Sequence, residues 1–239
     1  GTSFTNDASS TGIGTIDSTG SASDTSGFSI VSYTGNGSAG ATVKHGLSTA
    51  LDVIFIKNRD EAEAWQTYHR PLGATHHLSL NTTASSQDNA SRFNDVHPTS
   101  SVFTLGDNDT VNKNTVKFIA YCFAEKKGYS KFGSYTGNNN ANGTFVYTGF
   151  KPAYVMTKVT DTTDGWMIFD NKRNPHNVMD KYMTANGTGG DSTRDSIDFV
   201  SNGFKLRVAN TDCNNGIYIY MAFAENPFVT STGVPATAR

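Results

Sequence analysis

Histidine is the first side chain to consider for chemistry, because it binds metals and exchanges protons near neutral pH. The sequence has one local cluster, His76-His77, with His69 nearby. A metal site would need a third ligand at a spacing that a strand allows, and adjacent strand residues point to opposite faces. The pattern therefore favours surface histidines, and we expect no metal site and no cofactor.

Carboxylates offer a second kind of chemistry, since two of them facing each other across a cleft can cleave a glycosidic bond. The spacing of the available acids brings no two of them together. Nucleophilic catalysis would need an ordered triad, and no Gly-x-Ser-x-Gly elbow accompanies the many serines. We therefore predict that the chain is not an enzyme. The acids considered are Glu61, Glu63, Asp170 and Asp198.

One acidic segment, Asp107-Asn108-Asp109, resembles the start of a calcium loop. Such a loop also needs a glycine for its turn and a bidentate glutamate further on. Those later ligands are missing, so we expect a polar hairpin turn there.

Two tryptophans could stack on the face of a sugar. They occupy the same place in two halves of a repeat, and repeat-matched aromatics more often fill a shared core. The candidates for a ligand site are then Trp65, His69, His76, His77 and Trp166.

The repeat itself organises the chain. Residues 118–125 have a near copy at 217–225, and the segment SYTGN at 32–36 returns unchanged at 134–138. Further segments recur in the same order, each about 100 residues on, which is longer than solenoid periods of roughly 20 to 50 residues. Each copy is therefore expected to be a domain-sized unit. Glu125 and Glu225, which end the matched strands, are expected to bond a neighbouring turn.

Composition limits the class of partner. The 239 residues include 23 glycines, only 17% are charged, the formal net charge is −2 and the pI is about 6.3. A basic surface for nucleic acid or anionic lipid is therefore not expected. No apolar run approaches the roughly 20 residues of a membrane span, so we expect no membrane insertion.

Short alternating segments between polar turns predict an all-β chain. We predict two tandem homologous antiparallel β-sandwiches, jelly-roll-like, at 28–130 and at 131–239 with a C-terminal tail; periodicity alone also allows one larger joint sandwich. Residues 1–27, almost wholly polar, are predicted to be a linker or extended arm. The strands expected in the first unit are 28–33, 41–44, 51–57, 64–69, 78–80, 102–105 and 116–124.

The two cysteines occupy places that do not correspond between the copies. Cys122 lies within an expected strand and is interpreted as a small buried side chain, whereas Cys213 lies in a polar turn. We expect no disulfide between them.

Seven segments together resemble a family of uncharacterised tandem β domains found in large virion proteins of tailed, mainly marine, bacteriophages. The resemblance covers residues 27–228. Its motifs are GFSIVSYTGNG at 27–37, HGL at 45–47, VIFIKNR at 53–59, YCFAE at 121–125, GYSKFGSYTGN at 128–138, SNGFKLR at 201–207 and YMAFAENPF at 220–228.

The resemblance implies a location, the virion surface or tail fibre, and contributes no catalytic motif. It implies attachment to a host-surface glycan or protein, contacts with other virion proteins, and a homo-oligomer, by analogy a trimer. A purely structural module, such as a fibre spacer, decoration or neck component, is the alternative. The closing residues 235–239 are similar to the C-terminus of such proteins.

Overall fold

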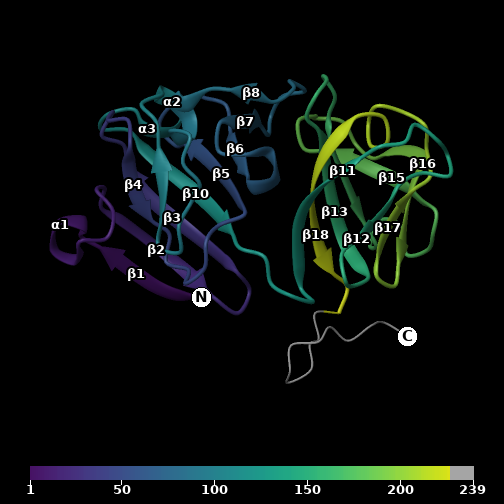
Figure 1. Cartoon of the computed structure of the whole chain (residues 1–239), viewed down its shortest axis with the longest axis horizontal. Coiled ribbons are helices and arrows are strands. Elements are labelled where there is room, and N and C mark those ends of the chain that lie inside the picture. The colour runs from purple at the N-terminus through teal and green to yellow at the C-terminus, as the bar shows by residue number, and fades with distance from the viewer. Residues whose placement is uncertain (227–239) are drawn as a thin grey trace. The chain divides into compact units, whose positions relative to one another are not determined.

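The computed structural model describes residues 1–226 and confirms an all-β chain with antiparallel sheets (Figure 1). The end of the last motif, 227–228, and the closing residues 235–239 lie outside the described residues. The chain divides into two compact units. Unit 1 comprises Gly1–Leu80 and Ser86–Glu125, and unit 2 comprises Asn81–Ser85 and Lys126–Arg239. Within residues 1–226 no helix has the length and apolar character needed to cross a membrane.

Unit 1 contains an eight-stranded sheet covered on one face by a two-stranded sheet, β4 (Ala41–Lys44) with β9 (Val102–Leu105). One-turn helices, α1 (Ala8–Thr11), α2 (Ala90–Phe93) and α3 (Asp109–Asn112), and a 3-10 turn, η1 (Arg70–Leu72), join the strands. In spatial order the large sheet runs β1 (Thr2–Asn6), β2 (Ser18–Ser23), β3 (Phe28–Thr34), β10 (Lys117–Phe123), β5 (Val53–Asn58), β6 (Gln66–His69), β7 (His76–Ser79) and β8 (Gln87–Asp88).

The core of unit 1 lies between these two sheets. Along β10 every second side chain is buried, as the two-residue period of a strand requires. Phe118 stacks on Tyr33 of β3 with ring centroids 5.3 Å apart, and Phe103 of β9 packs against the edge of Tyr33. The β sequence pattern thus places one apolar face of the large sheet against β4 and β9.

Residues 1–27 are not a linker, which corrects the expectation from their composition. They form β1, α1 and β2, and β2 pairs along its whole length with β3 (Figure 1). The backbone ladder does not depend on apolar side chains, and the few apolar residues present suffice as anchors: Ile16 is buried, and Phe4 and Ala22 pack on the core.

Unit 2 contains one eight-stranded sheet whose strands supply both layers of its core. Between β15 and β16 lies the glycine-rich segment 186–190, outside any strand, as expected of a loop. In spatial order the strands are β11 (Ser130–Thr136), β18 (Ile217–Ala224), β13 (Pro152–Val159), β14 (Trp166–Asp170), β15 (Met179–Thr184), β16 (Ser192–Val200), β17 (Gly203–Leu206) and β12 (Phe145–Tyr147).

The core of unit 2 again rests on aromatic side chains of the central strands. Tyr135 stacks on Tyr218 at 4.9 Å, and Phe204 of β17 packs edge-on against Tyr135. Cys213 lies in a turn, as expected, and is fully buried there; Cys122 is buried in a strand of unit 1, also as expected. Both thiols are free, and burial raises the pKa of each to about 12.

A buried asparagine joins two loops in unit 1. The Asn112 side-chain amide donates to the carbonyls of Ser38 and Gly106 at 3.0 and 2.8 Å, and its oxygen accepts the N–H of Asn36 at 3.0 Å. The Tyr33 hydroxyl donates to the neighbouring carbonyl of Val111 at 2.7 Å. We call this set the asparagine contact of unit 1.

Unit 2 has the matching contact. The Asn214 amide donates to the carbonyls of Asn140 and Val208 at 2.8 and 2.7 Å, and its oxygen accepts the N–H of Asn138 at 3.2 Å. The Tyr135 hydroxyl donates to the Cys213 carbonyl at 2.7 Å. Both contacts therefore satisfy buried polar groups that would otherwise destabilise the fold.

Each contact also requires a glycine in the approaching turn. A Cβ atom on Gly35 would lie 2.3 Å from the carbonyl oxygen of Lys113, and one on Gly137 would lie 2.2 Å from the carbonyl carbon of Asn214. The repeated Tyr-Thr-Gly-Asn sequence is thus explained by a tyrosine that donates, a glycine that permits close approach and a turn that binds the buried amide.

We predict that Asn112→Ala lowers the free energy of unfolding of unit 1 by about 3 kcal/mol, because it removes three hydrogen bonds and leaves the buried Gly106 carbonyl without the amide that binds it. Denaturant unfolding measures the change. Asn114→Ala, at an exposed position two residues on, is the control and should change stability by less than about 0.5 kcal/mol. Equal stability of the two variants would contradict the role assigned to Asn112.

Two buried histidines predict that acid destabilises the chain. His45 accepts the N–H of Leu47 at Nδ1, its Nε2 faces the Thr99 carbonyl at 3.2 Å, and burial lowers its pKa from 6.5 to about 4. Burial lowers the pKa of His77 equally. Because the unfolded chain takes up these protons first, stability present above pH 6.5 is lost as the pH falls toward 4.

Each histidine contributes a slope of about 1.4 kcal/mol per pH unit within that window. Unfolding free energies measured from pH 7 to pH 4 test this. The slope should shrink in His45→Asn, whose side-chain oxygen can accept the Leu47 N–H without titrating, and should persist in His76→Gln. A flat profile for the unaltered chain would contradict the burial of neutral histidines.

Candidate functional site

The structure leaves the sequence-derived candidates with little access to solvent. Trp166, His69 and His77 are almost wholly buried, at 2%, 1% and 3% exposure. The prediction of surface histidines is therefore wrong for His69 and His77, because β6 and β7 are inner strands of the large sheet. Trp65 and His76 are half-buried. Because a ligand in solution can reach only exposed atoms, the buried side chains are better placed to support the fold than to bind.

The two half-buried candidates, Trp65 and His76, contact other side chains of the protein. Trp65 stacks on Tyr121 with ring centroids 6.0 Å apart, and the His76 Nδ1 atom lies 2.8 Å from the Thr75 hydroxyl. Within residues 1–226 no group of three or more His, Cys, Asp or Glu side chains could hold a metal ion.

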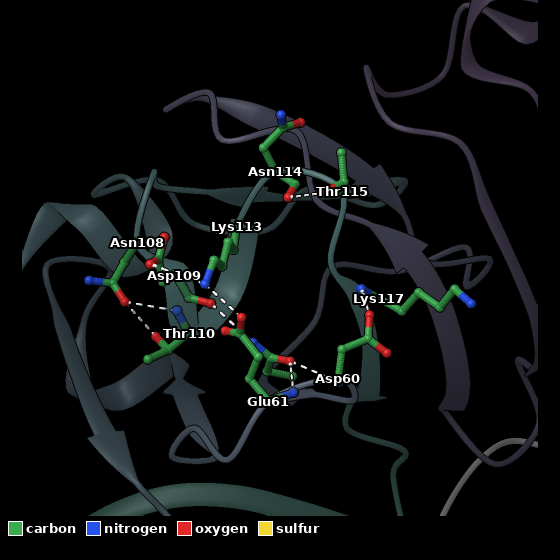
Figure 2. Close-up of polar contacts among 10 residues, drawn as sticks. Asp60, Glu61, Asn108, Asp109, Thr110, Lys113, Asn114, Thr115 and Lys117 are labelled. Atoms are coloured by element: carbon green, nitrogen blue, oxygen red, sulfur yellow. Dashed lines mark hydrogen bonds and ion pairs between the residues drawn. The ribbon is translucent and has the colours of Figure 1, made fainter.

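Three of the four acidic candidates form ion pairs with basic side chains. Glu61 pairs with Lys113 at 2.6 Å, Asp170 with Arg173 at 2.7 Å, and Asp198 with Arg207 at 3.3 Å. The segment expected to be a hairpin turn, 107–109, instead begins α3: the Asn108 side chain accepts the N–H of Thr110 at 3.0 Å and caps the helix (Figure 2). The Glu225 carboxylate binds Lys151 and Asn171, at 2.7 and 2.9 Å.

A recess of about 290 Å³ in unit 1 gathers polar side chains that the sequence did not single out. It crosses one end of the large sheet, from β1 through β2, β3 and β10 to the residue after β5. We call it the unit 1 groove. Its side chains form two rows across the strands.

The first row consists of hydroxyls. Strand register places Thr5 opposite Thr19, and Thr19 opposite Ser32. Directly opposed residues share a face of the sheet, so the three hydroxyls lie side by side. Such groups donate and accept hydrogen bonds with equal ease, which suits a ligand rich in hydroxyls.

The second row lies two residues further along each strand, toward the end of the sheet, and contains charged side chains. Asp7 and Asp17 stand at the β1–β2 end, Thr34 in the middle, and Lys117 and Arg59 at the β10–β5 end. The groove therefore has an acidic end and a basic end with hydroxyls between them.

The basic end is fixed through the backbone. The Lys117 N–H donates to the Asp60 carboxylate at 2.8 Å (Figure 2). The Arg59 N–H donates to the Lys117 carbonyl at 2.8 Å. The Asn58 side chain accepts the N–H groups of Asp60 and Glu61 and so fixes the turn. These bonds bring the two cationic residues side by side on neighbouring backbones.

The two cationic side chains themselves remain available to a ligand. Figure 2 shows the Lys117 ammonium pointing away from the Asp60 carboxylate that binds its N–H. Both Arg59 and Lys117 are exposed, and among residues 1–226 neither side chain forms a hydrogen bond or an ion pair. Lys113 differs, because its ammonium pairs with Glu61.

The acidic end is partly occupied by the chain. Asp17 accepts the N–H of Ala8 at 2.8 Å, and Asp7 caps α1 by accepting the Ser10 N–H and the Ser9 hydroxyl. These bonds, the Ser9 hydroxyl first, lower the pKa of Asp7. Both carboxylates are held in fixed positions and keep oxygen lone pairs for further acceptance.

Unit 2 has the same backbone arrangement without the charges. The Ile217 N–H donates to the Asp161 carboxylate at 3.1 Å, and the Thr160 N–H donates to the Ile217 carbonyl at 2.8 Å. Thr160 and Ile217 thus stand where unit 1 has Arg59 and Lys117. In the described part of unit 2, β11 is the edge strand, and the β1–β2 pair has no counterpart beside it.

One family model, described as a domain of unknown function (DUF7483), matches residues 4–227. The chain belongs to this family. The DUF7483 match begins at Phe4, the β1 residue that packs on the core, so β2 and the last three residues of β1 lie within the matched range. No curated protein and no solved structure matches the chain.

The DUF7483 domain also exposes two aromatic side chains on unit 2. Phe145 and Tyr147, two residues apart on β12, share a face and are 46% and 62% exposed. Exposed aromatic rings can stack on sugars. No sequence signal pointed to them, because 145–147 reads Phe-Val-Tyr, a run of apolar residues with no alternation.

The β1–β2 pair builds half of the groove, so a change that displaces it should be detectable. A Cβ atom on Gly20 would lie 2.3 Å from the Ile30 carbonyl, and we predict that Gly20→Ala separates β2 from β3. Hydrogen exchange should then speed up in 2–6 and 18–23 while β10 stays protected.

The control for this prediction is Ser3→Ala, an exposed position on β1. It should leave the exchange of both strands unchanged. Rapid exchange of 2–6 and 18–23 in the unaltered domain would instead support the linker interpretation of residues 1–27.

Proposed function

We propose that this DUF7483 domain is a non-enzymatic attachment module on the virion surface or tail fibre of a tailed bacteriophage, where it binds a glycan of the host surface. The observation that carries the proposal is the unit 1 groove, whose exposed hydroxyls and fixed charges belong to no catalytic arrangement described above. The virion location is supported by the resemblance of the seven sequence motifs.

The chemistry of the groove suits a sugar better than an apolar ligand. Thr5, Thr19 and Ser32 offer hydroxyls along one row, while Asp7 and Asp17 offer carboxylate acceptors at its end. Saccharides present many hydroxyls that need both donors and acceptors. A shallow polar groove of this kind can follow a chain of sugars across the strands.

We infer that the two units descend from one duplicated sandwich module. The support is the asparagine contact: Asn112 and Asn214 bind equivalent turn residues, and Tyr33 and Tyr135 each donate to the carbonyl before the asparagine. Independent origin would not be expected to repeat this set of bonds.

Assembly into a homo-oligomer, by analogy a trimer, would raise the strength of attachment. Several weak sites presented together gain through effective concentration. Other virion proteins are then the second class of partner. Unit 2, with Thr160 and Ile217 in place of the cations, favours the alternative that part of the chain is a structural spacer.

Binding of the isolated chain to an immobilised glycan array and to a panel of bacterial cells tests the proposal. We expect saturable binding to at least one glycan or cell type, lost on heat unfolding. Binding no stronger than that of the unfolded chain across the array and the panel would contradict an attachment role and support the purely structural alternative.

A further inference from the structure

The geometry points to an acidic polysaccharide as the ligand of the unit 1 groove: Arg59 and Lys117 hold its carboxylate, sulfate or phosphate group, and the hydroxyl row binds the sugar beside that group. This inference rests on the proposed function and adds the chemical class of the glycan. Three observations support it.

The first is that the two cations can reach one anion. Their backbones are neighbours, joined by the bond from the Arg59 N–H to the Lys117 carbonyl, and adjacent strands lie about 4.8 Å apart. An arginine fork with a lysine beside it is well suited to a carboxylate, sulfate or phosphate.

The second is that neither cationic side chain of the basic end is held in an ion pair by the described residues. Asp60 binds the Lys117 backbone N–H, and Glu61 pairs with Lys113. Asp7 and Asp17 belong to the other end of the row and accept backbone N–H groups of their own loop. The chain as a whole is net negative, yet this recess presents two adjacent cations that form no ion pair. These two cations can therefore bind an anion.

The third is the comparison between the units. In both units this turn is held by two hydrogen bonds from backbone N–H groups, one to an aspartate carboxylate and one to a backbone carbonyl. The geometry of the turn therefore does not require basic side chains. Unit 1 carries Arg59 and Lys117 at these positions, and its β1–β2 pair extends the sheet beside them, whereas no such pair is found in residues 126–226. Cations that the fold does not need are most simply explained by a ligand.

The test variant follows from this comparison. Arg59→Thr with Lys117→Ile installs the residues that unit 2 carries on the same backbone bonds. Both positions are exposed, so the variant should fold, and its melting temperature checks this. Arg59→Gln with Lys117→Gln is a second variant that removes the charges and keeps the length of the side chains.

The probes are oligogalacturonate for the carboxylate, a sulfated chondroitin oligosaccharide for the sulfate, a glycerol phosphate oligomer for the phosphate, and a maltooligosaccharide as the neutral reference. We expect at least one acidic probe to bind at least ten times more tightly than the neutral one. That preference should weaken as salt rises from 20 to 300 mM, because both cations are exposed to solvent, with a Debye length of about 10 Å at 0.1 M.

Both double variants should lower acidic-probe affinity at least ten-fold. Two controls separate the groove from general charge and from other surfaces. Lys172→Gln removes an exposed lysine of unit 2, and Phe145→Ala with Tyr147→Ala removes the exposed aromatic pair. Neither should change acidic-probe affinity by more than about two-fold, since neither lies in the groove.

The outcomes are distinguishable. Preference for the neutral probe, or unchanged acidic binding in both groove variants, would overturn this inference and leave glycan attachment standing. Loss of binding in the Phe145/Tyr147 variant alone would move the site to β12 and overturn it likewise. Absence of binding to every glycan and every cell would instead contradict the proposed function itself.

Discussion

The fold of each unit depends on a buried asparagine side chain that completes the hydrogen bonding of two loops. Asn112 and Asn214 are fully buried, and an uncharged amide can serve there because it offers both donors and an acceptor to backbone groups of the two loops. The tyrosine before each turn reaches the adjacent carbonyl, which ties the central strands to the same loop. Through these bonds the sheet ends beside the groove acquire a fixed geometry.

At this end of the sheet the two units carry different side chains. Unit 1 adds β1 and β2 to its sheet and places Arg59 and Lys117 beside them, whereas the corresponding turn of unit 2 carries Thr160 and Ile217. The same scaffold therefore appears in a charged and in an uncharged form within one chain. Preorganisation by backbone bonds lets a shallow site bind with little loss of conformational freedom.

Local pattern predicted much of the fold and little of the site. The strands at 41–44 and 102–105 follow from their alternation and coincide with β4 and β9. The prediction of a linker at residues 1–27 was wrong, because it was based on side-chain composition, whereas strands pair through their backbones. The groove joins residues far apart in sequence, such as Thr5 with Ser32 and Arg59 with Lys117, and only strand register brings them together. A signal did exist: the repeat differs in charge at those two positions.

We infer that the chain binds its ligand in the unit 1 groove. NMR of the isotope-labelled chain can locate the binding site, by following backbone amide shifts during titration with the best-binding acidic oligosaccharide. We expect the largest changes at 5–7, 17–19, 32–34, Arg59 and Lys117, with the corresponding residues of unit 2, Thr160 and Ile217, unaffected. Changes centred on β12, or an even distribution over both units, would contradict it.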